Sequence, residues 1–248
     1  MRIPFIAGNW KMYKTTAEAH HFAEELKTMY GETDVRAAIC APFTQLETLV
    51  RDFAGTGIGV GAQNVYFEKE GAFTGEISVP MLEEIGVDYC IVGHSERRQY
   101  FNETDETVNR KLKALLETKI RPILCVGEVL EQRDAGKEKE VVSGQVRAAL
   151  EGITAEQAER VVIAYEPVWA IGTGKTATPQ QANEMCGCIR DTLEELFDDA
   201  VADRIIIQYG GSVKPENATD IMNMEEIDGA LVGGASLDPA KFSEIINF

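Results

Sequence analysis

The stretch VVIAYEP, residues 161–167, contains the pattern that decides the fold. Its first five residues are apolar or aromatic and do not alternate with polar ones, as in a strand buried on both faces of a sheet. Comparable runs recur along the chain: IPFIAG at 3, AAICAP at 37, GIGVGAQ at 57, DYCIVGH at 88, RPILCVGE at 121, RIIIQYGG at 204 and GALVGGA at 229. We therefore expect eight buried strands.

Helical patterns separate these runs. Two segments, 15–30 and 104–118, place apolar residues three and four positions apart, as amphipathic helices do: Ala19, Phe22, Ala23, Leu26 and Met29 in the first, and Val108, Leu112, Leu115 and Leu116 in the second. A third segment, 178–197, opens with Thr178 as N-cap and Pro179 in the first turn. Strands that alternate with helices in this way form parallel sheets.

The alternation predicts an α/β protein in which residues 1–248 form one domain, a (β/α)8 TIM barrel with eight parallel strands. A doubly wound open sheet is the alternative that the pattern leaves open. A domain of this length buries enough apolar surface to be stable without disulfides. We find no linker or low-complexity tract that would divide it.

The composition excludes several classes of function. The formal net charge of −17 repels nucleic acid, so nucleic acid is not an expected partner. No apolar stretch is long enough to cross a membrane, and the N-terminal residues lack the pattern of a signal peptide. The five cysteines are scattered and form no CxxC pair, which is typical of free thiols in a reducing compartment. We expect a cytoplasmic protein.

In a barrel of parallel strands, catalytic groups lie at the carboxyl ends of the strands and in the loops that follow. This rule selects polar residues and glycines after most of the runs: Asn9, Lys11, Gln63, Asn64, His94, Glu128, Glu166, Gly210, Gly211, Ser212, Gly233 and Gly234. A carboxylate, an imidazole, an ammonium group and two glycine-rich turns are thus expected on one face of the barrel.

Glu166 is the candidate base. It ends an apolar strand and precedes Pro167, which keeps the glutamate out of helical geometry. A partly apolar pocket raises the pKa of a carboxyl group, so that it becomes a competent base near neutral pH. The following loop, PVWAIGTGKTA at 167–177, has the composition of a lid that keeps a reacting intermediate from water, with Gly172 near its tip. A salt bridge at the strand tip is the alternative for Glu166 taken alone.

His94 and Lys11 are the candidate electrophilic groups. In GHSERR, Ser95 is a plausible N-cap of a short helix, so that His94 lies at the helix N-terminus, where the dipole disfavours the imidazolium. Lys11 is the cation at the strand tips of the first four runs and would attract an anionic ligand. The alternatives are a structural histidine and a solvent-exposed lysine.

Paired glycines follow the seventh and eighth runs, in YGGSV at 209–213 and LVGGAS at 231–236. Barrels commonly bind phosphate at these positions through backbone N–H groups. Glycine lets the backbone approach the anion closely, because it has no Cβ. The pattern predicts a phosphate site.

Five segments in order, NWKM, GHSERR, AYEPVWAIGTGKTATP, YGGSVKPENA and GALVGGASL, closely resemble the triosephosphate isomerase family, and the resemblance covers residues 2–248. It implies the interconversion of dihydroxyacetone phosphate and D-glyceraldehyde 3-phosphate by proton transfer through an enediolate, in glycolysis and gluconeogenesis. It also implies that the protein needs no cofactor and no metal.

The resemblance assigns a role to each site residue. Glu166 moves the proton between two carbons, neutral His94 donates to the enediolate oxygens, and Lys11 and Asn9 stabilise the negative charge. Glu96 supports Lys11. The backbone phosphate ligands in this comparison are Gly172, Ser212, Gly233 and Gly234.

The segment at 61–78, GAQNVYFEKEGAFTGEIS, is similar to the family's third loop, which inserts into a partner subunit. Thr74 lies near its tip. The resemblance therefore implies a homodimer in which Thr74 abuts the other subunit's site.

Two rival functions are another phosphate-binding barrel of biosynthesis and a non-catalytic barrel that binds a sugar phosphate. The first would use other residues at its strand ends. The second has no use for the combination of Lys11, His94 and Glu166, because phosphate binding alone needs no base.

Overall fold

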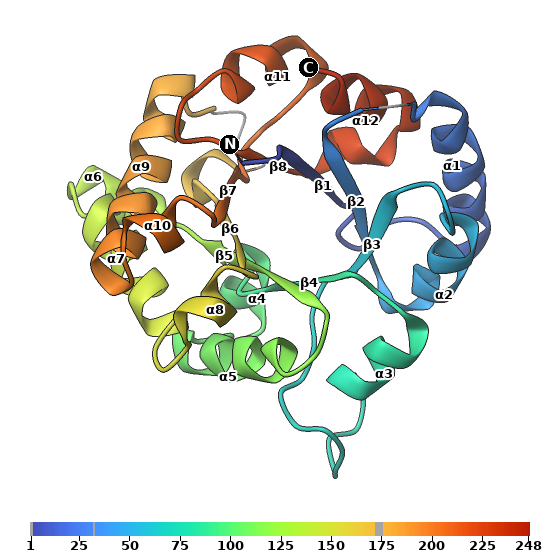
Figure 1. The fold of residues 1–248 in the computed structure, drawn as a ribbon, viewed down its shortest axis with the longest axis horizontal. Helices are drawn as coiled ribbons and strands as arrows, with labels where there is room; N and C mark the ends of the chain where they lie inside the picture. Colours follow the sequence, from blue (N-terminus) through green and yellow to red (C-terminus); the bar gives the residue numbers. More distant parts are fainter. Residues whose placement is uncertain (1, 32, 172–175) are drawn as a thin grey trace.

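The eight apolar runs form a closed barrel (Figure 1). The computed structural model describes residues 2–31, 33–171 and 176–248. In this part of the chain, eight parallel strands pair in the order of the sequence, and the last pairs with the first. The strands are β1 (Phe5–Asn9), β2 (Arg36–Ala41), β3 (Ile58–Ala62), β4 (Tyr89–Val92), β5 (Arg121–Val126), β6 (Val162–Tyr165), β7 (Ile206–Tyr209) and β8 (Gly229–Val232). The predicted barrel is confirmed, and the open sheet is wrong.

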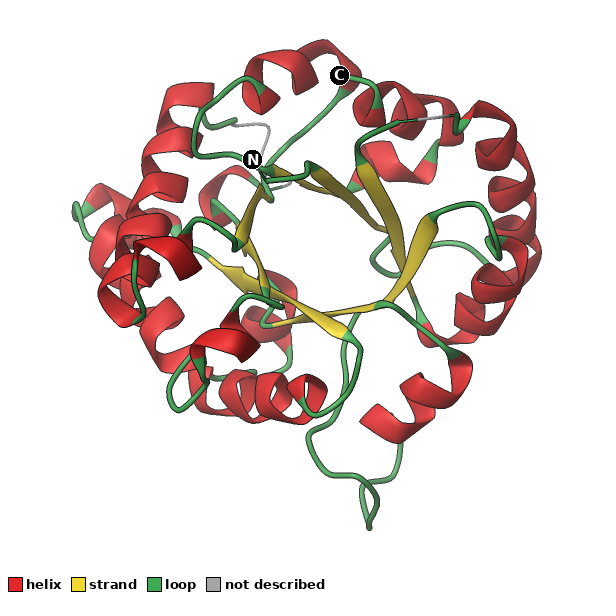
Figure 2. Ribbon diagram, in the orientation of Figure 1, coloured by secondary structure: helices red, strands yellow, loops and turns green. Residues whose placement is uncertain are grey.

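Helices surround the barrel (Figure 2). They are α1 (Thr16–Met29), α2 (Phe43–Asp52), α3 (Val79–Ile85), α4 (Ser95–Tyr100), α5 (Asp105–Leu116), α6 (Leu130–Asp134), α7 (Glu138–Ala149), α8 (Ala155–Ala158), α9 (Pro179–Leu196), α10 (Asp199–Ala202), α11 (Pro215–Met222) and α12 (Pro239–Ile246), with 3-10 turns η1 (Val168–Ala170) and η2 (Gly234–Leu237). None of the helices in the described residues is both long and apolar enough to cross a membrane.

Local sequence signals explain where the helices begin. The hydroxyl of Thr15 caps α1 in a capping box with Glu18, and Thr178 caps α9 with Pro179 in the first turn, as predicted. The apolar face of α1 is buried as expected, with one exception. Met29 is 42% exposed, because it is the last residue of the helix, and Tyr30 and Val35 of the following connection pack on the core instead.

The strands contribute to two apolar layers, and this explains their unbroken hydrophobic pattern. In β1, Phe5 and Ala7 belong to a cluster inside the barrel, whereas Ile6 belongs to the layer between barrel and helices. Because side chains alternate along a strand, the next inward position beyond Ala7 is that of Asn9. By the same alternation Glu166 follows Ala164 on the inner face of β6. The barrel itself therefore directs both polar side chains to its carboxyl end.

The connection between β3 and α3 projects away from the barrel (Figure 1). Its aromatic rings contact one another: Tyr66 stacks on Phe67 at 4.2 Å between centroids and lies 4.7 Å from Phe73. The guanidinium of Arg110 lies 3.6 Å from the centre of the Phe67 ring. Thr74, near the tip, is exposed. The loop is thus held in shape by its own aromatic side chains and by Arg110 of α5, and its end is exposed.

Candidate active site

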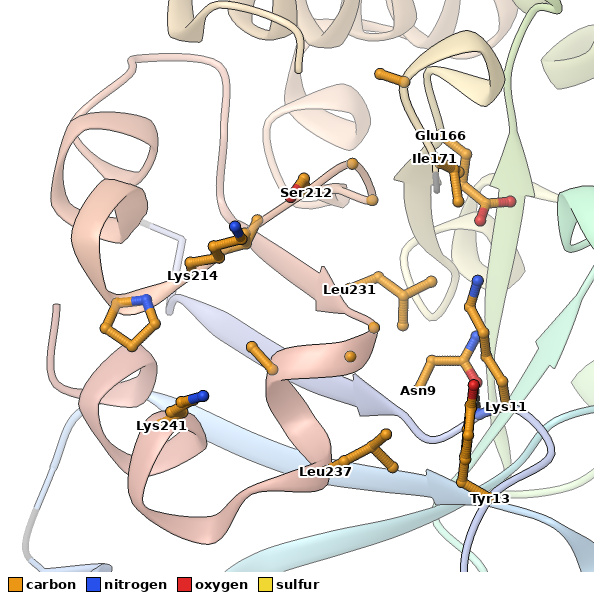
Figure 3. Close-up of a pocket in the computed structure, with 18 of the residues that line it drawn as sticks. Asn9, Lys11, Tyr13, Glu166, Ile171, Ser212, Lys214, Leu231, Leu237 and Lys241 are labelled. Carbon is orange, nitrogen blue, oxygen red and sulfur yellow. Dashed lines mark hydrogen bonds between the residues drawn. The ribbon is translucent and has the colours of Figure 1, made fainter. Parts of the chain in front are cut away.

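A cleft of about 600 Å³ opens at the carboxyl ends of the strands (Figure 3). It brings together most of the residues that the sequence selected: Asn9, Lys11, His94, Glu166, Gly210, Gly211, Ser212, Gly233 and Gly234. Glu96 borders an adjoining hollow. Thr74 lies on the projecting loop, and Gly172, with much of the expected lid, lies outside the described residues.

Glu166 is buried at the floor of this cleft, with 2% of its surface exposed. Its Oε1 lies 3.0 Å from Nε2 of His94. Its Oε2 accepts the backbone N–H of Ser95 at 2.9 Å, and the Ser95 hydroxyl donates to Oε1 at 3.3 Å. The carboxylate at the end of β6 is therefore held by the loop that follows β4.

The pKa of Glu166 is lowered in this arrangement, so the expectation of a raised value is wrong. Burial raises this pKa, but the charge and hydrogen bond of His94 and the N–H of Ser95 outweigh burial, with a smaller contribution from Lys11. Glu166 is consequently ionised at neutral pH, which is the form that a base requires.

The N-cap of α4 is His94. The sequence had suggested Ser95, the next residue. Its Nδ1 accepts the backbone N–H of Glu96 at 3.2 Å, which leaves the ring proton on Nε2, facing Glu166. Burial lowers the pKa of His94, but the Glu166 carboxylate reverses this and raises it above the ordinary value. The helix N-terminus disfavours the imidazolium, but the Glu166 carboxylate favours it, so the direction expected for the pKa of His94 is wrong while the two side chains are in contact.

Lys11 occupies a left-handed backbone conformation, with φ of 53°. This conformation costs a residue other than glycine about 1 kcal/mol. Hydrogen bonds from neighbouring side chains stabilise it at Lys11. Asn9 Oδ1 accepts the Lys11 N–H at 3.0 Å, and the amide of Gln63 donates to the Lys11 carbonyl at 2.9 Å. The ammonium group binds Glu96 Oε1 at 2.6 Å, as the resemblance implied. In Figure 3 it points toward the Glu166 carboxylate.

The glycine turns after β7 and β8 form the opposite wall of the cleft. A β-carbon at Gly211 would lie 2.1 Å from the Tyr209 hydroxyl, and one at Gly210 would lie 3.0 Å from Cγ of Glu166. Only glycine lets this backbone pass so close to the strand ends. The second turn is fixed from β1, since Trp10 Nε1 donates to the carbonyl of Ser236 in η2 at 3.0 Å.

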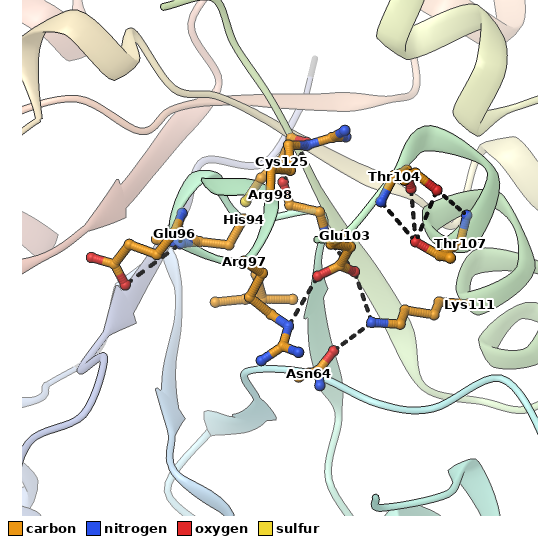
Figure 4. A network of polar contacts seen from close by, with 12 residues as sticks. Asn64, His94, Glu96, Arg97, Arg98, Glu103, Thr104, Thr107, Lys111 and Cys125 are labelled. Atoms are coloured by element: carbon orange, nitrogen blue, oxygen red, sulfur yellow. Dashed lines mark hydrogen bonds and ion pairs between the residues drawn. The ribbon is translucent and has the colours of Figure 1, made fainter. Parts of the chain in front are cut away.

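A buried ionic network supports the His94 loop from behind (Figure 4). The Glu103 carboxylate is 2% exposed and forms ion pairs with Lys111 at 2.8 Å and Arg97 at 2.9 Å. It also accepts a hydrogen bond from the Gly93 N–H at 3.3 Å. Lys111 also donates to Asn64 Oδ1 at 2.8 Å. The network joins the loops after β3 and β4. No periodic pattern marks Glu103 in the sequence, and the sequence reasoning missed it.

Glu128, selected as a strand-tip residue, does not line the cleft. It is fully buried, and its Oε1 accepts the Tyr165 hydroxyl at 3.1 Å, Trp169 Nε1 at 2.7 Å and an Arg133 N–H at 3.0 Å. These contacts tie η1, the start of the 167–177 loop, to the end of β5. Glu128 is therefore a structural anchor.

Further lining residues were missed by the sequence reasoning: Tyr13, Lys214 and Lys241. They lie beyond the strand tips, in the first turns of the connections and helices, where the strand-end rule does not reach. Ser95 was assigned to capping, although the GHS sequence between a strand and a helix marks it as a strand-end residue. Within the described residues, no group of three or more His, Cys, Asp or Glu side chains is placed to hold a metal ion.

Comparison with known proteins gives a consistent result. The family model for triosephosphate isomerase matches residues 4–248. A protein of Alkaliphilus metalliredigens with that name is 56% identical over 248 residues, which is the full length of both chains. One from Clostridium perfringens is 55% identical over the same length, and one from Carboxydothermus hydrogenoformans is 56% identical over 247 residues, 99% of this chain and 98% of the relative. The chain belongs to the triosephosphate isomerase family.

Proposed function

We propose that this protein interconverts dihydroxyacetone phosphate and D-glyceraldehyde 3-phosphate. One observation carries the proposal: an ionised carboxylate, an imidazole with its proton on Nε2 and an ammonium group meet in one cleft that also contains two glycine turns. The family membership supports the same reaction, a step of glycolysis and gluconeogenesis.

The proton transfer is assigned to Glu166. Its carboxylate takes a proton from C1 of the ketose, and the electron pair of the broken C–H bond forms the C1–C2 double bond while the C2 oxygen becomes negative. Return of the proton to C2, with the O1 proton passing to O2, gives the aldose. To reach the substrate, the carboxylate leaves the N–H of Ser95 and turns into the cleft.

His94 and Lys11 are assigned to the developing negative charge. When Glu166 turns toward the substrate, it no longer raises the pKa of His94, and burial, the largest cause, then lowers this pKa together with Lys11 against the opposing charge of Glu96. The imidazole is thereby kept as a neutral donor through Nε2. The Lys11 ammonium and the Asn9 amide lie at the same wall of the cleft and stabilise the oxyanion.

The phosphate group is assigned to the turns after β7 and β8. Backbone N–H groups of Ser212, Gly233 and Gly234 bind an anion without adding charge to a protein of net −17. Gly172 would complete the set. Glu96 holds Lys11 in position through the 2.6 Å ion pair.

We also propose a homodimer. A hollow of about 240 Å³ next to Lys11 and His94 is lined by Met12 and Phe101, which are 93% and 62% exposed. The projecting loop ends in exposed Thr74, with Phe73 40% exposed. The loop end carries an exposed aromatic ring, and the hollow is lined by exposed apolar side chains. We therefore expect the loop of one chain to enter the hollow of the other, so that Thr74 reaches the partner's site. The chain would act as one domain over residues 1–248, and its five free thiols suit the cytoplasm.

The decisive experiment compares the native protein with Glu166→Gln. With dihydroxyacetone phosphate in heavy water, the native protein should exchange deuterium into the substrate and produce the aldose, whereas the variant should do neither and still bind a phosphate analogue. Glu131→Gln, an exposed glutamate on α6, is the matched control and should behave as the native protein.

Two outcomes would overturn the proposal. Near-normal turnover by Glu166→Gln would show that Glu166 is not the base. A native protein that binds the sugar phosphate but shows neither exchange nor aldose would be the non-catalytic binding barrel.

A further inference from the structure

The end of the barrel opposite the active site contains two arginines that form no ion pair with a described residue. Arg36 is the first residue of β2 and Arg121 the first residue of β5. Both occupy inward positions, because Ala38 and Ile123, two residues further along their strands, belong to the cluster inside the barrel. In a chain of net charge −17, two inward-facing arginines at one end of the barrel need an explanation.

The strand register brings the two arginines near one tyrosine. Arg36 lies directly opposite Phe5, and Arg121 lies directly opposite Tyr89. The rings of Phe5 and Tyr89 stack with centroids 4.7 Å apart. The Phe5–Tyr89 pair therefore bridges the two guanidinium-bearing strands inside the barrel.

Neither guanidinium makes an ion pair with any residue that the structure describes. Arg121 donates from Nε to the carbonyl of Arg160 at 3.3 Å, and Arg160 in turn binds backbone carbonyls. Burial lowers the pKa of Arg121, Tyr89 opposes this shift, and the charges of Arg36 and Arg160 lower the pKa further. A partly buried cation beside like charges is unfavourable unless an anion offsets it.

A cleft of about 360 Å³ opens beside Arg36 and Tyr89, and Arg121, the register partner of Tyr89, is not among its lining residues. It is lined by Arg36 and Tyr89, by the glycine-rich backbone of the α2–β3 connection and by Asp88. Burial raises the pKa of Tyr89, so that its hydroxyl remains a proton donor at neutral pH. Asp88 is the carboxylate that opposes an anion here, and one of its oxygens is already engaged by the Val60 N–H at 2.9 Å.

We propose that this N-terminal mouth of the barrel binds a small tetrahedral oxyanion of the phosphate class between Arg36 and Arg121, with the Tyr89 hydroxyl as a third donor. Guanidinium groups match the oxygen spacing of such anions, and donors from three sides suit a tetrahedral ion better than a planar carboxylate. The site is separate from the cleft at the opposite end of the strands, and it does not depend on the reaction proposed for that cleft.

The test is equilibrium dialysis of the full-length protein with inorganic phosphate. The native protein should bind two phosphates per chain, one in each cleft, and Arg36→Gln/Arg121→Gln should bind one. Each charge-assisted contact accounts for roughly tenfold in affinity, so each single variant should weaken the second site by about that factor. Arg51→Gln/Arg147→Gln removes the same charge from exposed positions elsewhere and should still bind two.

A variant that should bind phosphate more tightly keeps the proposal testable even if the double variant does not fold. Asp88→Asn keeps the acceptor for the Val60 N–H but removes the opposing charge, so it should tighten phosphate at this site. Inhibition of isomerisation by phosphate reports the other cleft and should be the same in every variant. A native protein that binds one phosphate per chain, a double variant that keeps two, or an Asp88→Asn variant with unchanged affinity would overturn the proposal.

Discussion

The protonation of Glu166 depends on which neighbours it faces. Against Ser95 and His94, its carboxylate accepts two N–H groups and is fully ionised, and the same contact raises the pKa of the imidazole. Once the carboxylate turns into the cleft, it loses these donors while it stays among buried groups, and desolvation then favours its protonated form. In the proposed mechanism, a single side-chain rotation would thus convert a stable anion into a stronger base.

The coupled pair gives a pH signature in stability. The pKa of Glu166 is lowered from 4.5, so its contribution to the free energy of unfolding is complete above pH 4.5 and is lost as the pH falls through the folded value. The pKa of His94 is raised from 6.5, so its contribution is complete below pH 6.5 and is lost as the pH rises through the folded value. We predict that native protein and Glu166→Gln differ most in unfolding free energy between pH 4.5 and 6.5.

Urea unfolding of both proteins across this window and beyond each end measures the difference. It should shrink on either side of the window. A difference that does not change with pH would contradict the coupling between Glu166 and His94.

Lys11 should affect both binding and rate, since an ammonium group at this position meets an anion in every state of the reaction. We predict that Lys11→Ala lowers kcat/KM by roughly 100-fold to 1000-fold, with a raised KM and a lowered kcat in steady-state assays. Lys139→Ala removes the same charge from the outer surface, where the side chain is 56% exposed, and should leave both constants unchanged. An unchanged KM for Lys11→Ala would remove Lys11 from substrate binding.

At the scale of elements, the strand ends and turns position the site more than any single contact does. The turn after β7 is an example, because the Gly210 N–H donates to the carbonyl of Tyr165 at 2.7 Å and a β-carbon at Gly210 would meet Cγ of Glu166. The loop after β4 is another, since it supplies both the imidazole and the N–H that holds the base. Loops from strands that are not neighbours in the barrel therefore share one carboxylate.

We predict that Gly210→Ala lowers kcat by about tenfold or more and changes phosphate affinity less. Its β-carbon would lie 3.0 Å from Cγ of Glu166 and 3.1 Å from the Tyr165 carbonyl, and the base must shift to make room. Gly144→Ala in α7 is the control, since a β-carbon there meets nothing within 4 Å, and it should raise the free energy of unfolding by about 1 kcal/mol. Inhibition and turnover assays separate the two effects for Gly210→Ala, and a normal kcat would show that the turn does not position Glu166.

The elements also show what a sequence can predict. The eight strands were predictable because each is buried on both faces, and the strand-end rule then located Asn9, Lys11, His94 and Glu166. The contact between Ser95 and Glu166 was not predictable, because it joins the ends of β4 and β6, which are far apart in the sequence. The directions of both pKa shifts depend on the contact between His94 and Glu166, which joins the same two strand ends, so local motifs gave the wrong sign. Three helices, α6, α7 and α8, lie between β5 and β6, and a rule of one helix after each strand does not predict the additional two.

At the scale of the whole molecule, the exposed loop and the hollow beside the site make the proposed dimer testable. We predict that sedimentation shows a dimer and that Thr74→Arg, which places a charged side chain in the hollow, yields a monomer with lower kcat. Lys69→Ala, on the same loop with a side chain that is 77% exposed, should remain dimeric. A native protein that is monomeric at every concentration would contradict the role of the loop.

The pairing of β1 with β8 has a consequence for synthesis. Phe5 is made first among the strand residues, yet its partner on one side is Gly229. Until that last strand has left the ribosome, β1 carries an unpaired row of backbone N–H and C=O groups and the barrel has an open seam. A nascent chain halted before Gly229 is for that reason a natural client for chaperones, and a protease should cut it far more readily than the finished protein.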